Sequence, residues 1–197
     1  YHIFSLWKWV IKYIKKLNLI SIIKLNMSSS KRSKKYVKKT HYEHIIDVPD
    51  TYIGGIELIE EELYTIEEKD DNVQMVFKKI NYVPGLERIY EEILLNAFDQ
   101  TVREGTGVTK IKVNINRETG EISVYNDGEG IPVEIHEEYK VWIPAMIFGE
   151  LLTSSNYDKN QKRITGGKNG YGAKLTNIFS TSFKVETIDG KEKKKFI

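Results

Sequence analysis

The sequence contains no cysteine among its 197 residues. This absence excludes a disulfide-stabilised scaffold and a thiolate metal site, and it is typical of a reducing compartment. Acidic residues are missing from two stretches: residues 1–26 carry five lysines and no acid, and residues 31–39 carry six Lys or Arg and no acid. The net charge is still only +2, because residues 57–71 hold eight acids against one lysine. We expect this acidic stretch to be a solvent-facing hairpin or loop.

The chain also lacks an uninterrupted apolar run at its start. Four lysines interrupt the apolar residues of 1–26, so this segment is too charged for a membrane span and lacks the features of a signal peptide. The chain opens with Tyr1, and the first methionine is Met27. We expect residues 1–35 to be a basic extension outside the folded domain, either disordered or, before Met27, translated upstream sequence. A basic amphipathic helix that binds a membrane or a partner is the alternative for residues 1–26.

Hydrophobic residues make up 40% of the chain and charged residues 29%, which is typical of a globular domain with a substantial core. We expect that domain to span residues 36–197. The basic stretch 31–39 has two interpretations, a solvated tail or a patch for nuclear import or DNA phosphates.

Four glycines within seven positions mark a candidate phosphate site: Gly166, Gly167, Gly170 and Gly172. Glycine allows a backbone to approach a ligand closely, and the run that follows is predicted to be a helix over 171–180. Loop N–H groups and the Lys174 ammonium would then converge on one anion. The spacing is not that of a P-loop, which needs a hydroxyl after its lysine, nor of a dinucleotide fingerprint, which needs a third glycine. An ordinary glycine-rich turn is the alternative.

A second segment, residues 84–105, is predicted to be an amphipathic helix that starts at a proline and ends at a glycine. On its polar side, Glu92 and Asn96 lie one turn apart. A carboxylate and a neutral oxygen ligand in this arrangement could activate water beside a bound magnesium ion, although a solvent-facing stripe is the default interpretation. The predicted polar side holds Arg88, Glu92, Asn96, Asp99 and Arg103, and the apolar side holds Leu86, Tyr90, Ile93, Leu94, Ala97, Phe98 and Thr101.

A third segment is the predicted strand 121–126, which ends in polar residues and two glycines. Asn126 or Asp127 at its end can hydrogen-bond the edge of a base, and Gly128 and Gly130 leave room for the ring. An isolated turn of this composition is more often only a turn. Together, however, the three segments predict a nucleotide site.

The predicted fold class is α+β, a two-layer sandwich with helices on one face of a mixed sheet. The expected elements are an arm and short helix (36–47), strands at 56–66 and 73–80, the helix 84–104, strands at 109–116 and 121–126, helices at 144–152 and 171–180, and a hairpin that turns at 189–190.

The order of these segments resembles the ATPase superfamily shared by gyrase, the chaperone Hsp90, mismatch-repair MutL and histidine kinases. Three phrases are similar to eukaryotic type IIA DNA topoisomerase II: EHIIDVPDTYIG at 43–54, FGELLTSSNYD at 148–158 and TGGKNGYGAK at 165–174. The resemblance begins at about residue 36 and covers most of the chain.

The resemblance implies roles for individual residues. Glu92 would be the general base, Asn96 would hold Mg²⁺, and Asn126 would meet the adenine amino group. Tyr36 would lie on an N-terminal arm that crosses to the nucleotide of a partner subunit. The other residues implied to bind ATP are Asp99, Ser154, Ser155, Asn156, Gly167, Lys168, Asn169, Gly170, Tyr171, Gly172, Ala173 and Lys174.

The function that the resemblance implies is the ATP-operated clamp of a DNA topoisomerase, a nuclear homodimeric isomerase that passes one DNA duplex through another. It also implies that the last strands of the sheet and a transducer domain, with a lysine for the γ-phosphate, would follow residue 197. Two alternatives stay open: another ATPase of the superfamily, Hsp90-like or MutL-like, or a non-enzymatic DNA-binding module built on residues 31–39.

Overall fold

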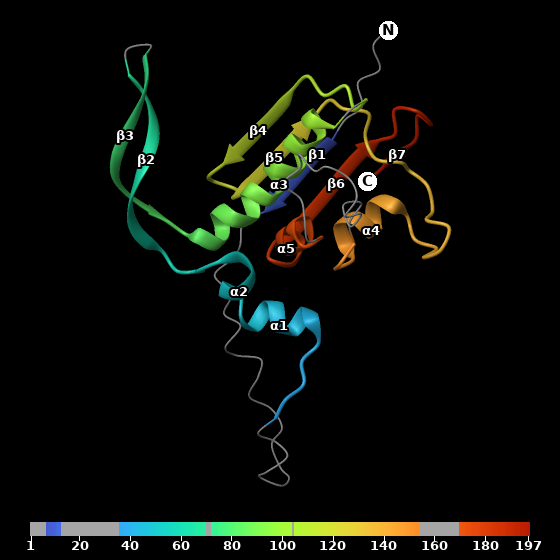
Figure 1. The fold of residues 1–197 in the computed structure, drawn as a ribbon, viewed down its shortest axis with the longest axis horizontal. Coiled ribbons are helices and arrows are strands. Elements are labelled where there is room, and N and C mark those ends of the chain that lie inside the picture. The colour runs from blue at the N-terminus through green and yellow to red at the C-terminus, as the bar shows by residue number, and fades with distance from the viewer. Residues whose placement is uncertain (1–6, 13–35, 70–71, 104, 154–169) are drawn as a thin grey trace.

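The computed structural model describes residues 7–12, 36–69, 72–103, 105–153 and 170–197. They form a five-stranded sheet with helices packed on it and a separate two-stranded hairpin (Figure 1). The α+β class expected from the sequence is confirmed. In chain order the elements are β1 (Trp7–Lys12), α1 (His41–Asp47), α2 (Asp50–Ile53), β2 (Ile59–Lys69), β3 (Asn72–Tyr82), α3 (Pro84–Val102), β4 (Ile111–Asn116), β5 (Glu121–Asn126), α4 (Ile143–Gly149), α5 (Gly172–Ile178), β6 (Ser182–Ile188) and β7 (Lys195–Phe196).

The five-stranded sheet has the order β4-β5-β1-β6-β7, and each of its described pairings is antiparallel. The sequence-based expectation of a mixed sheet is wrong in this respect. The reason lies in β1, which runs antiparallel to both β5 and β6. These two strands therefore point the same way, as expected for strands joined by a helical crossover, but β1 separates them.

The position of β1 corrects a second expectation. The sequence predicts that residues 1–35 lie outside the folded domain, yet residues 7–12 form the middle strand of the sheet. Their sequence, WKWVIK, is rich in aromatic and β-branched residues, which favour strands. The rest of residues 1–35 lies outside the described part of the chain.

The long helix α3 lies across one face of the sheet (Figure 1). Its buried Ile93 and Ala97 pack with Val124 of β5 in a core cluster that also receives Phe183 and Val185 of β6. The helix confirms the predicted span to within a few residues. The predicted faces are partly wrong, because Phe98 is exposed and Asp99 is buried.

The acidic stretch forms the expected hairpin, which is the two-stranded sheet of β2 and β3. The hairpin projects away from the five-stranded sheet (Figure 1). Its charged side chains pair across the strands, as in Lys79 with Glu60 at 3.0 Å. Most of its side chains remain exposed.

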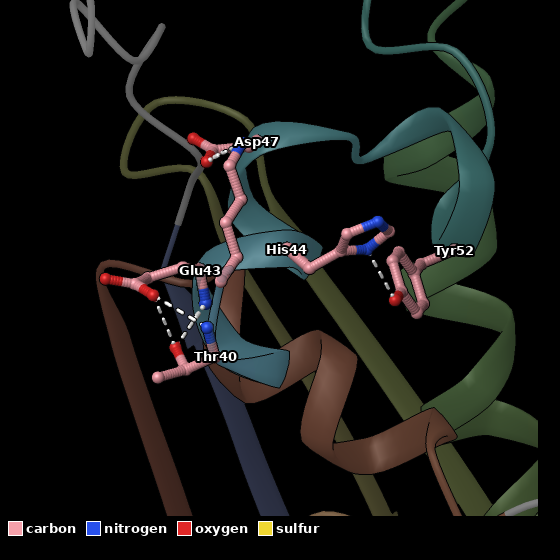
Figure 2. Close-up of polar contacts among 6 residues, drawn as sticks. Thr40, Glu43, His44, Asp47 and Tyr52 are labelled. Atoms are coloured by element: carbon pink, nitrogen blue, oxygen red, sulfur yellow. Dashed lines mark hydrogen bonds and ion pairs between the residues drawn. The ribbon is translucent and has the colours of Figure 1, made fainter. Parts of the chain in front are cut away.

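The short helix α1 is fixed at both ends by its own side chains (Figure 2). Thr40 and Glu43 form a capping box, in which the Glu43 carboxylate accepts from Thr40 N at 2.8 Å and Thr40 Oγ1 accepts from Glu43 N at 3.2 Å. Lys39 pairs with Asp47 at 2.6 Å. The side chains of His44 and Tyr52 are joined at 2.8 Å, which links α1 to α2.

Candidate nucleotide site

Glu92 lies in the first half of α3 and points to the start of α5. Its side chain is 18% exposed, and its carboxylate forms an ion pair with Arg88 at 2.6 Å, one turn earlier on the helix. Burial raises the pKa of Glu92, and the positive charge of Arg88 opposes this shift. A carboxyl group with a raised pKa is a better proton acceptor near neutral pH.

Gly172, the first residue of α5, provides the space that the Glu92 carboxylate occupies. A Cβ atom built on Gly172 would overlap the Glu92 carboxylate oxygen. The glycine is therefore required for close approach between α3 and the start of α5. The structure brings together two residues that the sequence separates by 80 positions.

Lys174 is buried in the first turn of the same helix, with 5% of its surface exposed. Its ammonium donates a hydrogen bond to the Thr153 carbonyl at 2.6 Å, and within the described residues it makes no ion pair. Burial lowers the pKa of Lys174 to about 8. A buried cation without a counter-charge is costly, so this position is suited to an anionic ligand.

Two hydrogen bonds, one buried and one partly buried, hold α5 against its neighbours. Thr176 Oγ1 donates to the Ile89 carbonyl of α3 at 2.9 Å. Asn177 Nδ2 donates to the Phe148 carbonyl of α4 at 3.1 Å. Both contacts fix the position of Lys174 relative to Glu92.

Asn126 ends β5 beneath the second half of α3 and is 1% exposed. Its Nδ2 donates to the Ala97 carbonyl at 3.5 Å. Its Oδ1 has no hydrogen-bond partner among the described residues. A buried acceptor without a donor is costly, so a ligand donor such as an amino group would satisfy it.

The neighbouring Asp127 has a structural role instead. Its carboxylate accepts from Thr109 N and Lys110 N, both at 2.8 Å, and from Thr109 Oγ1 at 2.6 Å. Burial alone would raise the pKa of Asp127, but these hydrogen bonds outweigh it and lower the pKa. Of the two residues that the sequence offered for contact with a nucleobase, only Asn126 has a buried side-chain atom without a hydrogen-bond partner among the described residues.

Two further predicted residues lie on α3. Asn96 is half-buried one turn after Glu92, and Asp99 is buried. Neither position tests the predicted contact with magnesium or nucleotide. Within the described residues there is no cluster of three or more His, Cys, Asp or Glu side chains that could hold a metal ion without help from other ligands.

The glycine-rich loop is described only from Gly170 onward. Gly170 has a φ of +68°, a conformation that favours glycine, and Tyr171 and Ala173 follow on the way into α5. The other predicted ligands lie outside the described residues: Ser154, Ser155, Asn156, Gly167, Lys168 and Asn169.

The predicted arm residue Tyr36 is 82% exposed in the single chain. It precedes α1, which touches the loop through an aromatic cluster that sequence analysis missed. His41 Nε2 and the Tyr171 hydroxyl are 3.1 Å apart, and Tyr52 packs near both rings. No spacing signal in the sequence connects His41 with Tyr171, which lies 130 positions further along. Arg88, by contrast, could have been found from its place four residues before Glu92.

Within the described residues, no helix has the length and apolar character needed to cross a membrane.

Comparison with known proteins agrees with this geometry. Residues 81–195 match the family model of histidine kinase-, DNA gyrase B- and HSP90-like ATPases. Among curated proteins, DNA topoisomerase 2 of Acanthamoeba polyphaga mimivirus is 50% identical over 175 residues, covering 88% of this chain and 14% of the relative. DNA topoisomerase 2 of Pisum sativum is 52% identical over 171 residues, covering 87% of this chain and 11% of the relative. The chain thus spans a small part of these relatives.

Solved structures give the same result. The ATPase region of Saccharomyces cerevisiae topoisomerase II is 51% identical with a TM-score of 0.78, covering 83% of this chain and 42% of that one. The ATPase and transducer domains of DNA topoisomerase II from Balamuthia mandrillaris are 45% identical with a TM-score of 0.77, covering 83% of this chain and 41% of that one. The chain belongs to the histidine kinase-, DNA gyrase B- and HSP90-like ATPase family, and within it resembles the ATPase region of topoisomerase II.

Proposed function

We propose that this chain is the ATP-binding part of an ATP-dependent type IIA DNA topoisomerase, in which ATP binding closes a clamp on DNA and hydrolysis resets it. The observation that carries the proposal is the buried Lys174, which has no ion-pair partner among the described residues and lies beside the contact between Gly172 and Glu92. A buried cation of this kind is stabilised when a phosphate binds.

The described residues fit a nucleotide at two ends. At the phosphate end, Lys174 supplies positive charge, and the glycines at 170 and 172 allow the backbone to approach. At the base end, the free Oδ1 of Asn126 would accept from an adenine amino group. The two ends lie along α3, near Glu92 and Ala97 respectively. These two positions are separated along the helix by a rise of about 7.5 Å.

Glu92 is the proposed general base of hydrolysis. Its carboxylate would accept a proton from the water that attacks the terminal phosphorus, while the ion pair with Arg88 fixes its orientation. Lys174 would stabilise the negative charge of the phosphates.

Magnesium is the proposed metal. The side-chain oxygen of Asn96 is a ligand of the type that Mg²⁺ accepts, and the position one turn from Glu92 suits a metal shared with the phosphates. When bound, the metal would neutralise phosphate charge.

The remaining proposals concern the whole protein, of which this chain covers 14% or less in the curated relatives above. We propose a DNA substrate, a homodimer in which the arm bearing Tyr36 reaches the partner's nucleotide, and a nuclear location. The basic stretch 31–39 supports import or contact with phosphates. Hsp90-like or MutL-like function, or a DNA-binding module without ATPase activity, is not favoured, because the relatives reported above are topoisomerases.

Calorimetric titration of the chain with a non-hydrolysable ATP analogue, with and without Mg²⁺, tests the site. We expect binding that Mg²⁺ strengthens and that favours adenine over guanine nucleotides. Asn126→Ala should remove the preference for adenine, and Asn114→Ala, at an exposed position on β4, is its control. Asn96→Ala should remove only the magnesium-dependent part of the affinity. Absence of binding by the folded chain would overturn the proposal.

A further inference from the structure

One face of the β2–β3 hairpin consists of apolar side chains that belong to neither described core cluster. The register pairs Tyr64 with Phe77 and Ile66 with Met75, and directly paired residues lie on the same face of a sheet. Val73, two positions before Met75, extends this face. All five side chains are between 54% and 74% exposed. Contiguous exposed apolar surface of this kind marks sites of contact with other molecules.

The hairpin also has two free edges (Figure 1). Its sheet contains only β2 and β3 among the described strands, so the outer edge of each strand has no neighbour there. Along such an edge, alternate residues direct their N–H and C=O groups away from the existing pair. These groups are available to hydrogen-bond an added strand, a mode of recognition in which the side chains provide specificity.

The edge of β2 carries negative charge at defined positions. Along the apolar face of β2, the order of side chains is Glu62, Tyr64, Ile66 and Glu68, each two residues from the next. The ion pairs of the hairpin use other glutamates, so Glu62 and Glu68 have no ion-pair partner within the described residues. The strand β3 contains no acidic residue. The two edges therefore differ, and only the edge of β2 combines apolar side chains with unpaired negative charge.

We propose that the edge of β2 is a docking site for an extended basic segment of a partner protein, which adds to the hairpin as a third strand. The segment that fits has Lys or Arg at its first and seventh positions and apolar side chains at its third and fifth. In this register the cations meet Glu62 and Glu68, and the apolar side chains cover Tyr64 and Ile66. Opposite charges and apolar pairs directly across from each other stabilise neighbouring strands. The inference does not depend on the proposed nucleotide site, because it uses only residues of the hairpin.

A second copy of the same strand does not fit this edge. If two copies of β2 paired antiparallel with Tyr64 opposite Ile66, the same register would place Glu62 opposite Glu68 at both ends of the contact. Like charges directly opposite each other are destabilising. The two glutamates thus oppose pairing between copies and favour a basic partner.

NMR titration of the isotope-labelled chain with a designed peptide tests the docking site. The probe is a heptapeptide with blocked ends and the order Lys, Thr, Val, Thr, Val, Thr, Lys, and its control has Glu in place of both Lys residues. We expect the lysine peptide to shift the backbone amide signals of β2 and to leave those of β6 unchanged, whereas the control peptide shifts neither. Absence of shifts in β2, or equal shifts with the two peptides, would overturn the proposal.

The charge contacts are tested by a double substitution. Glu62→Gln/Glu68→Gln should weaken binding of the lysine peptide by about fivefold, because two exposed ion pairs are lost. The control Glu137→Gln/Glu138→Gln removes the same charge at exposed positions outside any helix or strand, and it should bind the peptide like the wild type. Equal affinities of the two double variants would show that the glutamates of β2 do not select a basic partner, and the proposal would be wrong.

The position of the added strand is tested by two substitutions on the apolar face. Ile66→Thr and Val73→Thr both keep a β-branched side chain at an exposed position, but only Ile66 lies on β2. We expect several-fold weaker binding of the lysine peptide to Ile66→Thr and unchanged binding to Val73→Thr. Equal weakening would mean that the peptide lies across the face instead of along the edge of β2. That result, or unchanged binding to both variants, would overturn the addition of a third strand.

Discussion

At the scale of single residues, the candidate site depends on the absence of a side chain at Gly172. The Glu92 carboxylate occupies the space where a Cβ atom would lie, and the ion pair with Arg88 holds it there. We predict that Gly172→Ala displaces Glu92 and lowers ATP turnover by about 10²-fold or more, the usual contribution of a positioned general base. Steady-state phosphate release, measured in a protein that contains the whole ATPase region, checks this prediction.

Gly149→Ala is the matched control for this substitution. Gly149 is the last residue of α4, and a Cβ atom there would contact nothing within 4 Å. Its turnover should equal that of the wild type. Equal turnover of Gly172→Ala and Gly149→Ala would show that Glu92 does not need its present position.

Lys174 shows how a functional residue can lower stability. Burial lowers its pKa from the ordinary value of 10.5, which applies to the unfolded chain, to about 8 in the folded chain. Between these two values the unfolded chain holds the extra proton, so the free energy of unfolding rises with pH through this window. The buried ammonium therefore destabilises the ligand-free domain below pH 8, by an amount on the order of 3 kcal/mol.

We predict that Lys174→Met raises the melting temperature at pH 7 and that this gain shrinks by pH 10. The same variant should lose affinity for the ATP analogue, because the phosphates lose their buried positive charge. Thermal unfolding at several pH values and calorimetric titration at pH 7 measure the two effects. Lys191→Met, at an exposed position, should show neither. A gain in stability that did not change between pH 7 and 10 would contradict the assigned cause.

At the scale of elements, the β2–β3 hairpin contributes no side chain to either described core cluster. It carries exposed apolar side chains on both strands: Tyr64, Ile66, Val73, Met75 and Phe77. An isolated two-stranded hairpin is only marginally stable in water. We predict that its amides exchange with solvent at least about tenfold faster than those of β5, as native-state hydrogen exchange would measure. Exchange as slow as that of β5 would show that the hairpin is stabilised by more than its own pairing.

Elements with strong local signals could be predicted from the sequence. The helix α3 begins at Pro84 and has an amphipathic pattern. The strands of the hairpins are runs that contain β-branched residues, and turn residues separate these runs. The position of β1 could not be predicted, because its partners β5 and β6 lie more than 100 residues away and strand pairing at that distance leaves no local pattern. Tertiary packing likewise reversed the expected sides of Phe98 and Asp99.

The candidate site shows the same division. Glu92 could be selected by its spacing from Asn96, and Asn126 and Lys174 by residue type and neighbouring glycines. The structure gives each of the three a distinctive environment. The different roles of Asn126 and Asp127 could not be predicted from the sequence. They follow from a tertiary contact, in which the Asp127 carboxylate accepts hydrogen bonds from the backbone N–H groups of residues 109–110.

At the scale of the whole molecule, a chain of contacts connects the candidate nucleotide site to the N-terminal arm. Tyr171 precedes the first residue of α5, and its hydroxyl meets His41 at the start of α1. The arm that leads into α1 carries the exposed Tyr36 and Val37. In the proposed homodimer, these two side chains would lie on the arm that reaches the partner. A nucleotide bound beside Tyr171 would therefore bias the position of the arm through α1.

We predict that Tyr171→Phe weakens the coupling between nucleotide binding and dimerisation. The variant keeps its ring and its backbone groups and loses only the hydroxyl that meets His41, so a nucleotide contact through the loop backbone is kept and the analogue should bind the monomer with nearly unchanged affinity. Dimer formation should then require several-fold more protein, because the lost hydrogen bond would have contributed about 1 kcal/mol to the coupling.

Light scattering over a range of protein concentrations, with saturating analogue, measures this change. The control is Tyr42→Phe, at an exposed position on α1, which should dimerise like the wild type. If Tyr171→Phe also dimerised like the wild type, the contact between α1 and the loop would serve only to pack the two elements together.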